Sequence, residues 1–256
     1  MVQVIETVYE MQAFSDRGRV GGKTVGCVPT MGYLHEGHLS LIRESVKRAD
    51  FTVMTLFVNP TQFGTGEDLD MYSRDFEGDC KKARDAGADA VFYPSVEEMY
   101  SGGPPVWVTV DELTADLEGE FRPTHFRGVT TVVAKLFNAV KPHLAVFGEK
   151  DFQQLKVIQR MVRDLLMGVE IVGAPTVREP DGMAMSSRNV YLSPGERERA
   201  LSISRSLMDA AKAVENGGRD PGSISERAKQ TISDAGLEID YVEIRDESTL
   251  RPIKRI

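Results

Sequence analysis

Short apolar runs alternate with helical patterns along the first 175 residues, and this alternation limits the possible folds more than any other feature. The runs predicted as strands cover residues 24–29, 51–58, 88–93, 144–147 and 169–172. The segments predicted as helices cover residues 38–49, 76–86, 128–140 and 151–167. The run at 51–58 is apolar without a break, which is typical of a parallel strand buried on both faces. The alternation therefore predicts an α/β fold, a parallel sheet with helices on both faces.

The pattern changes after residue 175. Residues 194–216 form a long helical pattern, with Ser193 as N-cap and a proline at the first helical position. Residues 223–235 predict a second helix, and residues 240–244 a short strand. We therefore expect a Rossmann-like domain over residues 1–175 and a smaller α+β domain over residues 176–256.

Composition excludes several classes of protein. The formal net charge of −8 gives no basic face for nucleic acid, although a small anion can bind where the local charge is positive. No apolar run approaches the ~18 residues of a membrane span, and the N-terminus lacks the pattern of a signal peptide. Cys27 and Cys80 form no CxxC motif, which favours reduced thiols in the cytoplasm. We expect a cytoplasmic protein with neither nucleic-acid nor membrane partners.

The stretch PTMGYLHEGH at residues 29–38 joins a predicted strand to a predicted helix. The first turn of a helix has unpaired N–H groups and a positive dipole end, which attract phosphate. His35 and His38 can donate hydrogen bonds there to a phosphate whose charge grows during reaction. The alternatives are an ordinary helix start and a metal pair, but no third ligand stands at suitable spacing. The motif favours binding of nucleotide phosphates and nucleotidyl transfer.

Two further stretches also follow predicted strands, at the sheet edge where α/β folds bind ligands. In FVNPTQF, residues 57–63, Asn59 and Gln62 can bind hydroxyl or carboxylate groups without adding charge, although Asn-Pro is also a common turn. In FGEKDFQQ, residues 147–154, Lys150 suits a phosphate. Asp151 could cap the next helix, or meet a ribose hydroxyl or magnesium.

A fourth stretch, DGMAMSSRN at residues 181–189, lies in a predicted loop. Ser186, Ser187 and Arg188 offer hydroxyls and a guanidinium that can wrap a triphosphate. Taken alone the stretch is a weak signal and is more typical of a solvated loop. It gains weight because it follows the histidine motif in the same chain.

The four stretches together resemble the pantoate–β-alanine ligase family of the nucleotidylyltransferase superfamily, from Pro29 to Leu192. The resemblance implies that the carboxylate of pantoate attacks the α-phosphorus of ATP, giving pantoyl adenylate and pyrophosphate. The amine of β-alanine then attacks the acyl carbon, giving pantothenate and AMP. It also implies magnesium on the ATP, a homodimer, a first domain that binds nucleotide and pantoate, and a second domain that covers the active site.

The resemblance also implies site residues. His35, His38, Lys150 and Arg188 would be catalytic. The histidines would hold the phosphates, Lys150 the α/β region, and Arg188 together with Ser186 the departing pyrophosphate. The ATP contacts would be Met31, His35, His38, Gly148, Glu149, Lys150, Asp151, Val177, Met185, Ser186, Ser187 and Arg188. Pantoate would meet Pro29, Met31, Gln62, Val132, Val133 and Gln154, and β-alanine would meet Asn59 and Gln62. No side chain is implied as a magnesium ligand.

The chemistry of the adenylation step agrees with these implied roles. A carboxylate is already ionised at pH 7, so adenylation needs alignment and charge neutralisation rather than a general base. The second step needs a neutral amine, and the sequence offers no obvious base for it. We further expect the Gly-rich residues 64–70 to close over the reacting groups.

Two alternative functions stay open, and the chain differs from the family's usual pattern at one point. Another nucleotidylyltransferase with a phosphorylated acceptor would share the histidine motif, and so would a nucleotide sensor without activity. The family usually continues past the strand near residues 241–244 into a segment like Thr-Arg-Leu-Ile-Asp-Asn, whereas this chain stops at Ile256. We therefore expect a shortened second domain.

Overall fold

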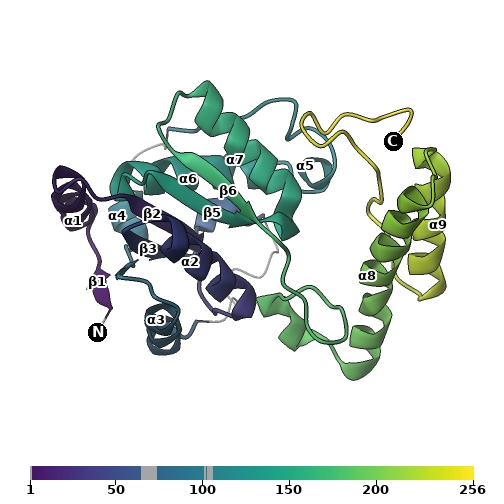
Figure 1. Ribbon diagram of the computed structural model, residues 1–256, viewed down its shortest axis with the longest axis horizontal. Coiled ribbons are helices and arrows are strands. Elements are labelled where there is room, and N and C mark those ends of the chain that lie inside the picture. Colours follow the sequence, from purple (N-terminus) through teal and green to yellow (C-terminus); the bar gives the residue numbers. More distant parts are fainter. Residues whose placement is uncertain (1, 65–73, 101, 103–105) are drawn as a thin grey trace. The chain divides into compact units, whose positions relative to one another are not determined.

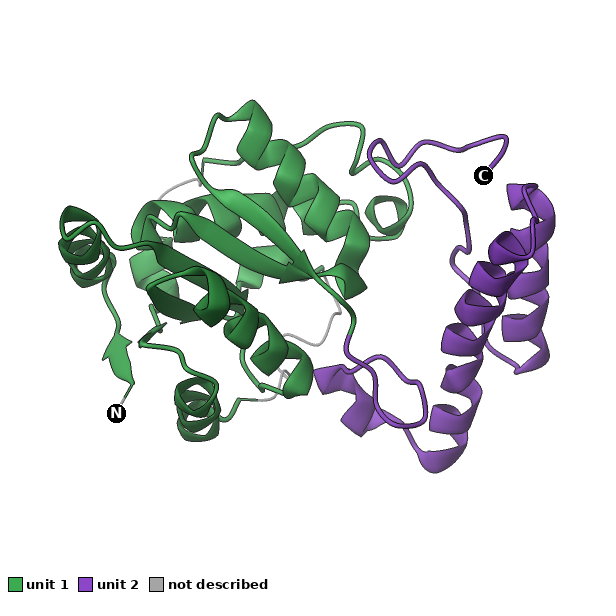
Figure 2. Ribbon diagram, viewed as in Figure 1, with its two compact units in different colours: residues 1–176 green, residues 177–256 purple. Residues whose placement is uncertain are grey.

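The computed structural model describes residues 2–64, 74–100, 102 and 106–256. The chain divides into two compact units, unit 1 at Met1–Thr176 and unit 2 at Val177–Ile256, which Figure 2 shows in different colours. Apart from Gly64, the segment expected to close over the site lies outside the described residues. Within the described part of the chain, no helix is both long and apolar enough to cross a bilayer.

A parallel sheet forms the centre of unit 1 (Figure 1). Its six strands run in the order β1-β4-β3-β2-β5-β6, and every described pair is parallel. The strands are β1 (Gln3–Ile5), β2 (Val25–Thr30), β3 (Phe51–Leu56), β4 (Ala90–Phe92), β5 (Leu144–Gly148) and β6 (Glu170–Ala174). This architecture confirms the predicted α/β fold.

Helices cover both faces of the sheet, because alternate strand residues point to opposite sides. Val25 and Cys27 of β2 belong to one buried cluster, which α1 (Val8–Val20), α6 (His125–Val140) and α7 (Phe152–Asp164) complete. Val28 belongs to the other cluster, which α2 (Glu36–Arg48) and α3 (Phe76–Asp85) cover. The remaining short helices of unit 1 are η1 (Pro60–Gln62), α4 (Val96–Met99), α5 (Glu118–Phe121) and η2 (Glu149–Asp151).

The order of the strands creates a switch point between β2 and β5. From β2 the chain adds β3 and β4 on one side, and from β5 it adds β6 on the other. The two strands pair directly, with Gly26 opposite Leu144 and Cys27 opposite Ala145. Open α/β sheets bind ligands at the carboxyl ends of strands beside such a point. The turn after β2 carries the histidine motif, and the turn after β5 carries Lys150.

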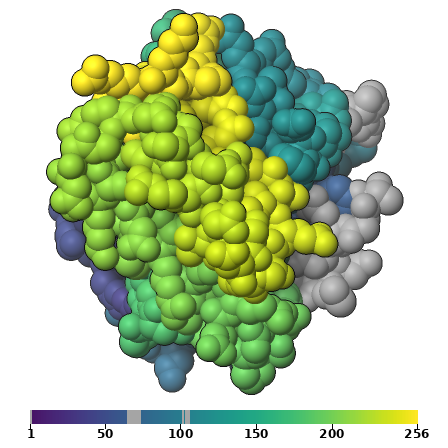
Figure 3. All heavy atoms as spheres, turned by 90° about the vertical axis from the view of Figure 1, so that its right-hand side faces the viewer, coloured from purple at the N-terminus to yellow at the C-terminus, as the bar shows by residue number. Residues whose placement is uncertain are grey.

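Unit 2 is helical, with η3 (Ser187–Tyr191), α8 (Pro194–Glu215) and α9 (Pro221–Asp234). The helices α8 and α9 lie side by side and form much of the surface in Figure 3. The predicted strand at residues 240–244 is wrong, since the nearest pairing is one isolated bridge from Arg245 to Pro252. Proline has no N–H to donate, so a ladder cannot continue through it.

Candidate active site

The two motif histidines cap α2. His35 is the N-cap residue, and its Nδ1 accepts a hydrogen bond from the backbone N–H of Gly37 at 3.1 Å. The Nδ1 of His38 accepts from the backbone N–H of His35 at 3.4 Å, and the two ring centroids are 4.1 Å apart. Since Nδ1 is an acceptor in both rings, each neutral imidazole carries its proton on Nε2. Both rings therefore have an Nε2–H as their donor.

The surroundings of His38 keep its ring neutral. Burial lowers the pKa of His38 from 6.5 to about 3, assisted by electrostatic interactions with His35, Lys150 and Lys82, which disfavour a positive charge on this ring. At pH 7 His38 is thus a neutral hydrogen-bond donor. The same interactions show that Lys150, which follows β5, lies within electrostatic range of the turn that follows β2. The structure therefore brings His35, His38 and Lys150 together at one edge of the sheet.

Helix α3 holds the backbone of this turn in a strained shape. Gly32 and Tyr33 both have positive φ, at 91° and 52°. The buried carboxylate of Asp79 accepts from the N–H groups of Tyr33 and Leu34, each at 2.7 Å. Lys82 donates to the carbonyl of Leu34 at 2.9 Å. Asp79 and Lys82 were missed by sequence analysis, because their partners lie more than 40 residues away and no local pattern marks them.

Burial raises the pKa of Asp79, and the two backbone N–H groups oppose that rise. A carboxylate with two N–H donors is a strong anchor, because charge-assisted hydrogen bonds are shorter and stronger than neutral ones. Asp79 therefore fixes the turn from outside the motif itself.

Lys150 stands on η2 with 41% of its side chain exposed, and its Nζ lies 3.2 Å from the Oδ1 of Asp151. Asp151 stands at the N-cap position of α7, as the cap alternative expects, but its side chain makes no capping hydrogen bond there. A Cβ built on Gly148 would meet nothing closer than the backbone N of Lys150 at 4.0 Å. Glu149 and Asp151 are exposed. This segment leaves polar backbone and charged side chains accessible after β5.

Residues predicted for pantoate come from β2, η1, α6 and α7, together with Met31 directly after β2. Gln62 is 9% exposed, and its Nε2 lies 3.1 Å from the Sδ of Met31. Val132 and Val133 are buried on α6, which packs against η1. Pro29 in β2 and Gln154 on α7 are each partly buried. The neighbouring Gln153 instead donates to the carbonyls of residues 113 and 116 and is structural.

The fourth motif forms a tight loop in unit 2. The N–H of Met185 donates to the carbonyl of Val177 at 3.0 Å, and Arg178 forms an antiparallel bridge with Ala184. Ser186 then caps η3, where its Oγ accepts from the N–H of Arg188 at 3.2 Å. Ser187 is partly buried and Arg188 is exposed.

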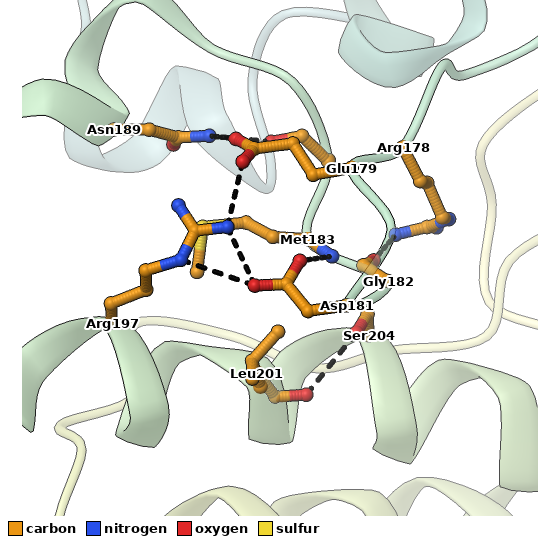
Figure 4. A network of polar contacts seen from close by, with 10 residues as sticks. Arg178, Glu179, Asp181, Gly182, Met183, Asn189, Arg197, Leu201 and Ser204 are labelled. Atoms are coloured by element: carbon orange, nitrogen blue, oxygen red, sulfur yellow. Dashed lines mark hydrogen bonds and ion pairs between the residues drawn. The ribbon is translucent and has the colours of Figure 1, made fainter. Parts of the chain in front are cut away.

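Arg197 of α8 braces this loop (Figure 4). Its Nη2 lies 2.7 Å from the Oε2 of Glu179 and 2.6 Å from the Oδ2 of Asp181. Asn189, next to Arg188, donates to Glu179 at 2.8 Å and to the carbonyl of Ala184 at 3.0 Å. The guanidinium thus ties the motif to α8 directly at Asp181 and, through Glu179, indirectly at Asn189, a role that the sequence pattern did not reveal.

Comparison with known sequences gives a match over almost the whole chain. The sequence profile of the family described as Pantoate-beta-alanine ligase matches residues 3–256. A pantothenate synthetase from Sulfurihydrogenibium sp. is 55% identical over 257 residues, covering 100% of this chain and 92% of the relative. One from Thermotoga petrophila is 54% identical, covering 100% and 91%.

Comparison with solved structures gives matches to the same family. A crystal structure of pantothenate synthetase from Thermus thermophilus has a TM-score of 0.94 at 46% identity, covering 100% of this chain and 91% of the other. A pantoate-beta-alanine ligase from Francisella tularensis, complexed with beta-gamma ATP and beta-alanine, has a TM-score of 0.84 at 31% identity. That match covers 96% of this chain and 90% of the other.

Proposed function

The chain belongs to the pantoate–β-alanine ligase family, and on this premise we propose that it joins pantoate to β-alanine in an ATP-dependent reaction. The match over residues 3–256 carries the proposal. A carboxylate oxygen of pantoate attacks the α-phosphorus of ATP, and pyrophosphate leaves. The amine of β-alanine then attacks the acyl carbon of the pantoyl adenylate, forming pantothenate and releasing AMP.

The first step depends on donors and charges rather than on a base. The Nε2–H groups of His35 and His38 donate to phosphate oxygens whose negative charge grows in the transition state. Lys150 supplies a positive charge to the α and β phosphates. A neutral His38 can take this role at pH 7, because its Nε2 already carries the proton that it donates to the phosphate. Gly148, Glu149, Asp151 and Met31 would complete the adenosine and ribose contacts of unit 1.

The residues of unit 2 would act on the departing group. Ser186, Ser187 and Arg188 offer two hydroxyls and a guanidinium, which suit the terminal phosphates. Val177 and Met185, paired across the base of the loop, would contribute backbone to the nucleotide.

Pantoate combines two methyl groups with two hydroxyls and a carboxylate. Gln62 and Gln154 would bind its polar groups, while Pro29, Met31, Val132 and Val133 would face its methyl groups. Neutral amides favour this substrate over a phosphorylated acceptor, for which a site needs cationic side chains. β-Alanine would then enter near Asn59 and Gln62.

We also propose magnesium on the ATP phosphates, a homodimer and a cytoplasmic location, all three from the family resemblance. Among the described residues no group of three His, Cys, Asp or Glu side chains could hold a metal ion. Phosphate oxygens and water are ligands that magnesium accepts. When bound, magnesium would neutralise phosphate charge, beside the contribution of Lys150. Sedimentation of the purified protein tests the dimer.

Exchange of labelled pyrophosphate into ATP tests the proposal directly. We expect exchange only when pantoate is present, and release of AMP only when β-alanine is added as well. The variants His38→Ala and Lys150→Ala should each slow exchange by about 10²–10³-fold while keeping the circular dichroism of the wild type. Exchange with other acids but not with pantoate would favour another nucleotidylyltransferase, and ATP binding without turnover would favour a sensor.

A further inference from the structure

Asn59 is a buried amide whose hydrogen bonds are all made within the protein. Only 1% of the residue is exposed. Its Nδ2 donates to the carbonyl of Gly128 and to the Oε1 of Gln62, each at 3.2 Å. Its Oδ1 accepts from the hydroxyls of Tyr100 at 2.8 Å and Thr61 at 3.0 Å. Both ends of this amide are therefore occupied before any substrate binds.

The partners of Asn59 fix which end of the amide faces which way. The carbonyl of Gly128 can only accept, and the backbone N–H of Thr61, 3.4 Å from Oδ1, can only donate. A reversed Asn59 would place oxygen against oxygen and N–H against NH₂. Gly128 can come this close because it has no side chain: a Cβ there would lie 2.4 Å from the carbonyl oxygen of Thr61.

The fixed amide of Asn59 in turn orients Gln62. Because Asn59 presents an NH₂ group, the Oε1 of Gln62 must face Asn59. The Nε2 of Gln62 then faces the opposite way, toward the Sδ of Met31, which is an acceptor. Gln62 thus offers an NH₂ group, and not its oxygen, on the side of Met31.

We propose that Asn59 and Tyr100 are positioning residues that fix Gln62 as a hydrogen-bond donor to an acceptor oxygen of pantoate. This inference rests on the proposed function and deepens it. Gln62 selects for a carboxylate or hydroxyl oxygen and offers nothing to the ammonium group of β-alanine. On this proposal β-alanine can still bind nearby, but the occupied amide of Asn59 acts on the substrates indirectly, through Gln62.

Nuclear magnetic resonance of the side-chain amides tests the orientation in the unaltered protein. The ¹⁵N-labelled NH₂ signals of Gln62 and Asn59 are assigned by their loss in Gln62→Glu and in Asn59→Ser. Addition of pantoate alone should shift the Gln62 signal strongly and the Asn59 signal weakly. A Gln62 signal that does not move, or an Asn59 signal that moves further, overturns the proposal.

Kinetics separates positioning from general stability. Tyr100→Phe removes one donor to Asn59 and should raise the KM for pantoate about 3–10-fold, with kcat and the KM for ATP within about twofold. Tyr9→Phe, at a tyrosine 80% exposed on α1, is the matched control and should change neither KM. Asn59→Asp leaves only acceptors beside Gln62, so Gln62 should turn its oxygen toward pantoate and raise that KM about 100-fold.

The outcomes distinguish this inference from the proposed function. If the wild type shows no pantoate-dependent exchange, the proposed function fails. If exchange is normal and Tyr100→Phe leaves the KM for pantoate unchanged, or raises the KM for ATP equally, only the positioning role fails. If Asn59→Asp does not fold, the amide signals of the wild type and the kinetics of Tyr100→Phe still test the positioning role.

Discussion

Each imidazole at the start of α2 serves two purposes through two different nitrogens. The Nδ1 of His35 accepts the N–H of Gly37 in the first helical turn, and the Nδ1 of His38 accepts the N–H of the N-cap residue His35, as the two side chains of a capping box do elsewhere. In each ring that bond places the proton on Nε2, where a phosphate oxygen can accept it. A serine could cap the helix but would not reach as far with a donor. The cap and the proposed phosphate contact therefore favour the same residue type.

Acid should destabilise the protein through His38. Its pKa is about 3 in the folded chain and 6.5 when unperturbed, so below pH 6.5 the unfolded chain gains a proton that the folded chain refuses. This stability is complete above pH 6.5 and is lost as the pH falls toward 3. His38→Asn keeps an acceptor near the Nδ1 position and does not titrate. Between pH 7 and 4, urea unfolding should show the wild type losing roughly 1–3 kcal/mol more than His38→Asn. Equal losses would contradict a depressed pKa.

At the scale of elements, α3 should control the shape of the histidine turn. Asp79→Asn replaces one accepting oxygen by an NH₂ group that faces a backbone N–H of Tyr33 or Leu34. We expect a loss of about 1–3 kcal/mol in the free energy of unfolding and slower pyrophosphate exchange. Asp85→Asn, at the exposed end of the same helix, is the control and should change neither. Normal exchange in Asp79→Asn would mean that the turn holds its shape without this anchor.

The brace of Arg197 should matter for ATP more than for pantoate. A lysine keeps the charge but cannot reach Glu179 and Asp181 with two separate donors in one plane. We expect Arg197→Lys to raise the KM for ATP about 3–10-fold and to leave the KM for pantoate within about twofold. Arg199→Lys, two residues further along the exposed side of α8, provides the comparison. An equal rise of both KM values would indicate a general loss of structure instead.

The strands and helices of unit 1 could be predicted because their signals are local. Every predicted element of this unit is present, with bounds that differ by at most three residues. Helix α1 was missed, since it buries only Met11 and Ser15 and shows little apolar periodicity. Asp79, Tyr100 and Arg197 gave no signal either, because each acts through contacts that only the folded chain creates. The motif residues could be identified and the residues that hold them could not.

At the scale of the whole molecule, the residues proposed for ATP are divided between the two units. His35, His38 and Lys150 belong to unit 1, and Ser186 and Arg188 to unit 2. Contacts within each unit hold these segments: Asp79 holds the histidine turn and Asp151 pairs with Lys150 in unit 1, and Arg197 braces the loop of Ser186 and Arg188 in unit 2. Both sets are thus shaped before ATP binds, which limits the ordering that binding must impose.

A double-mutant cycle tests whether the two units act on one ATP molecule. If Lys150 and Arg188 stabilise the same transition state, each alanine variant alone should slow exchange by about 10²–10³-fold. The double variant should then lose at least about tenfold less than the product of the single losses, because residues that act as a unit are not additive. Arg84→Ala, at an exposed ion pair on α3, should have little effect alone and combine additively with Lys150→Ala. A fully multiplicative loss for Lys150 and Arg188 would mean that they serve different ligands or different steps.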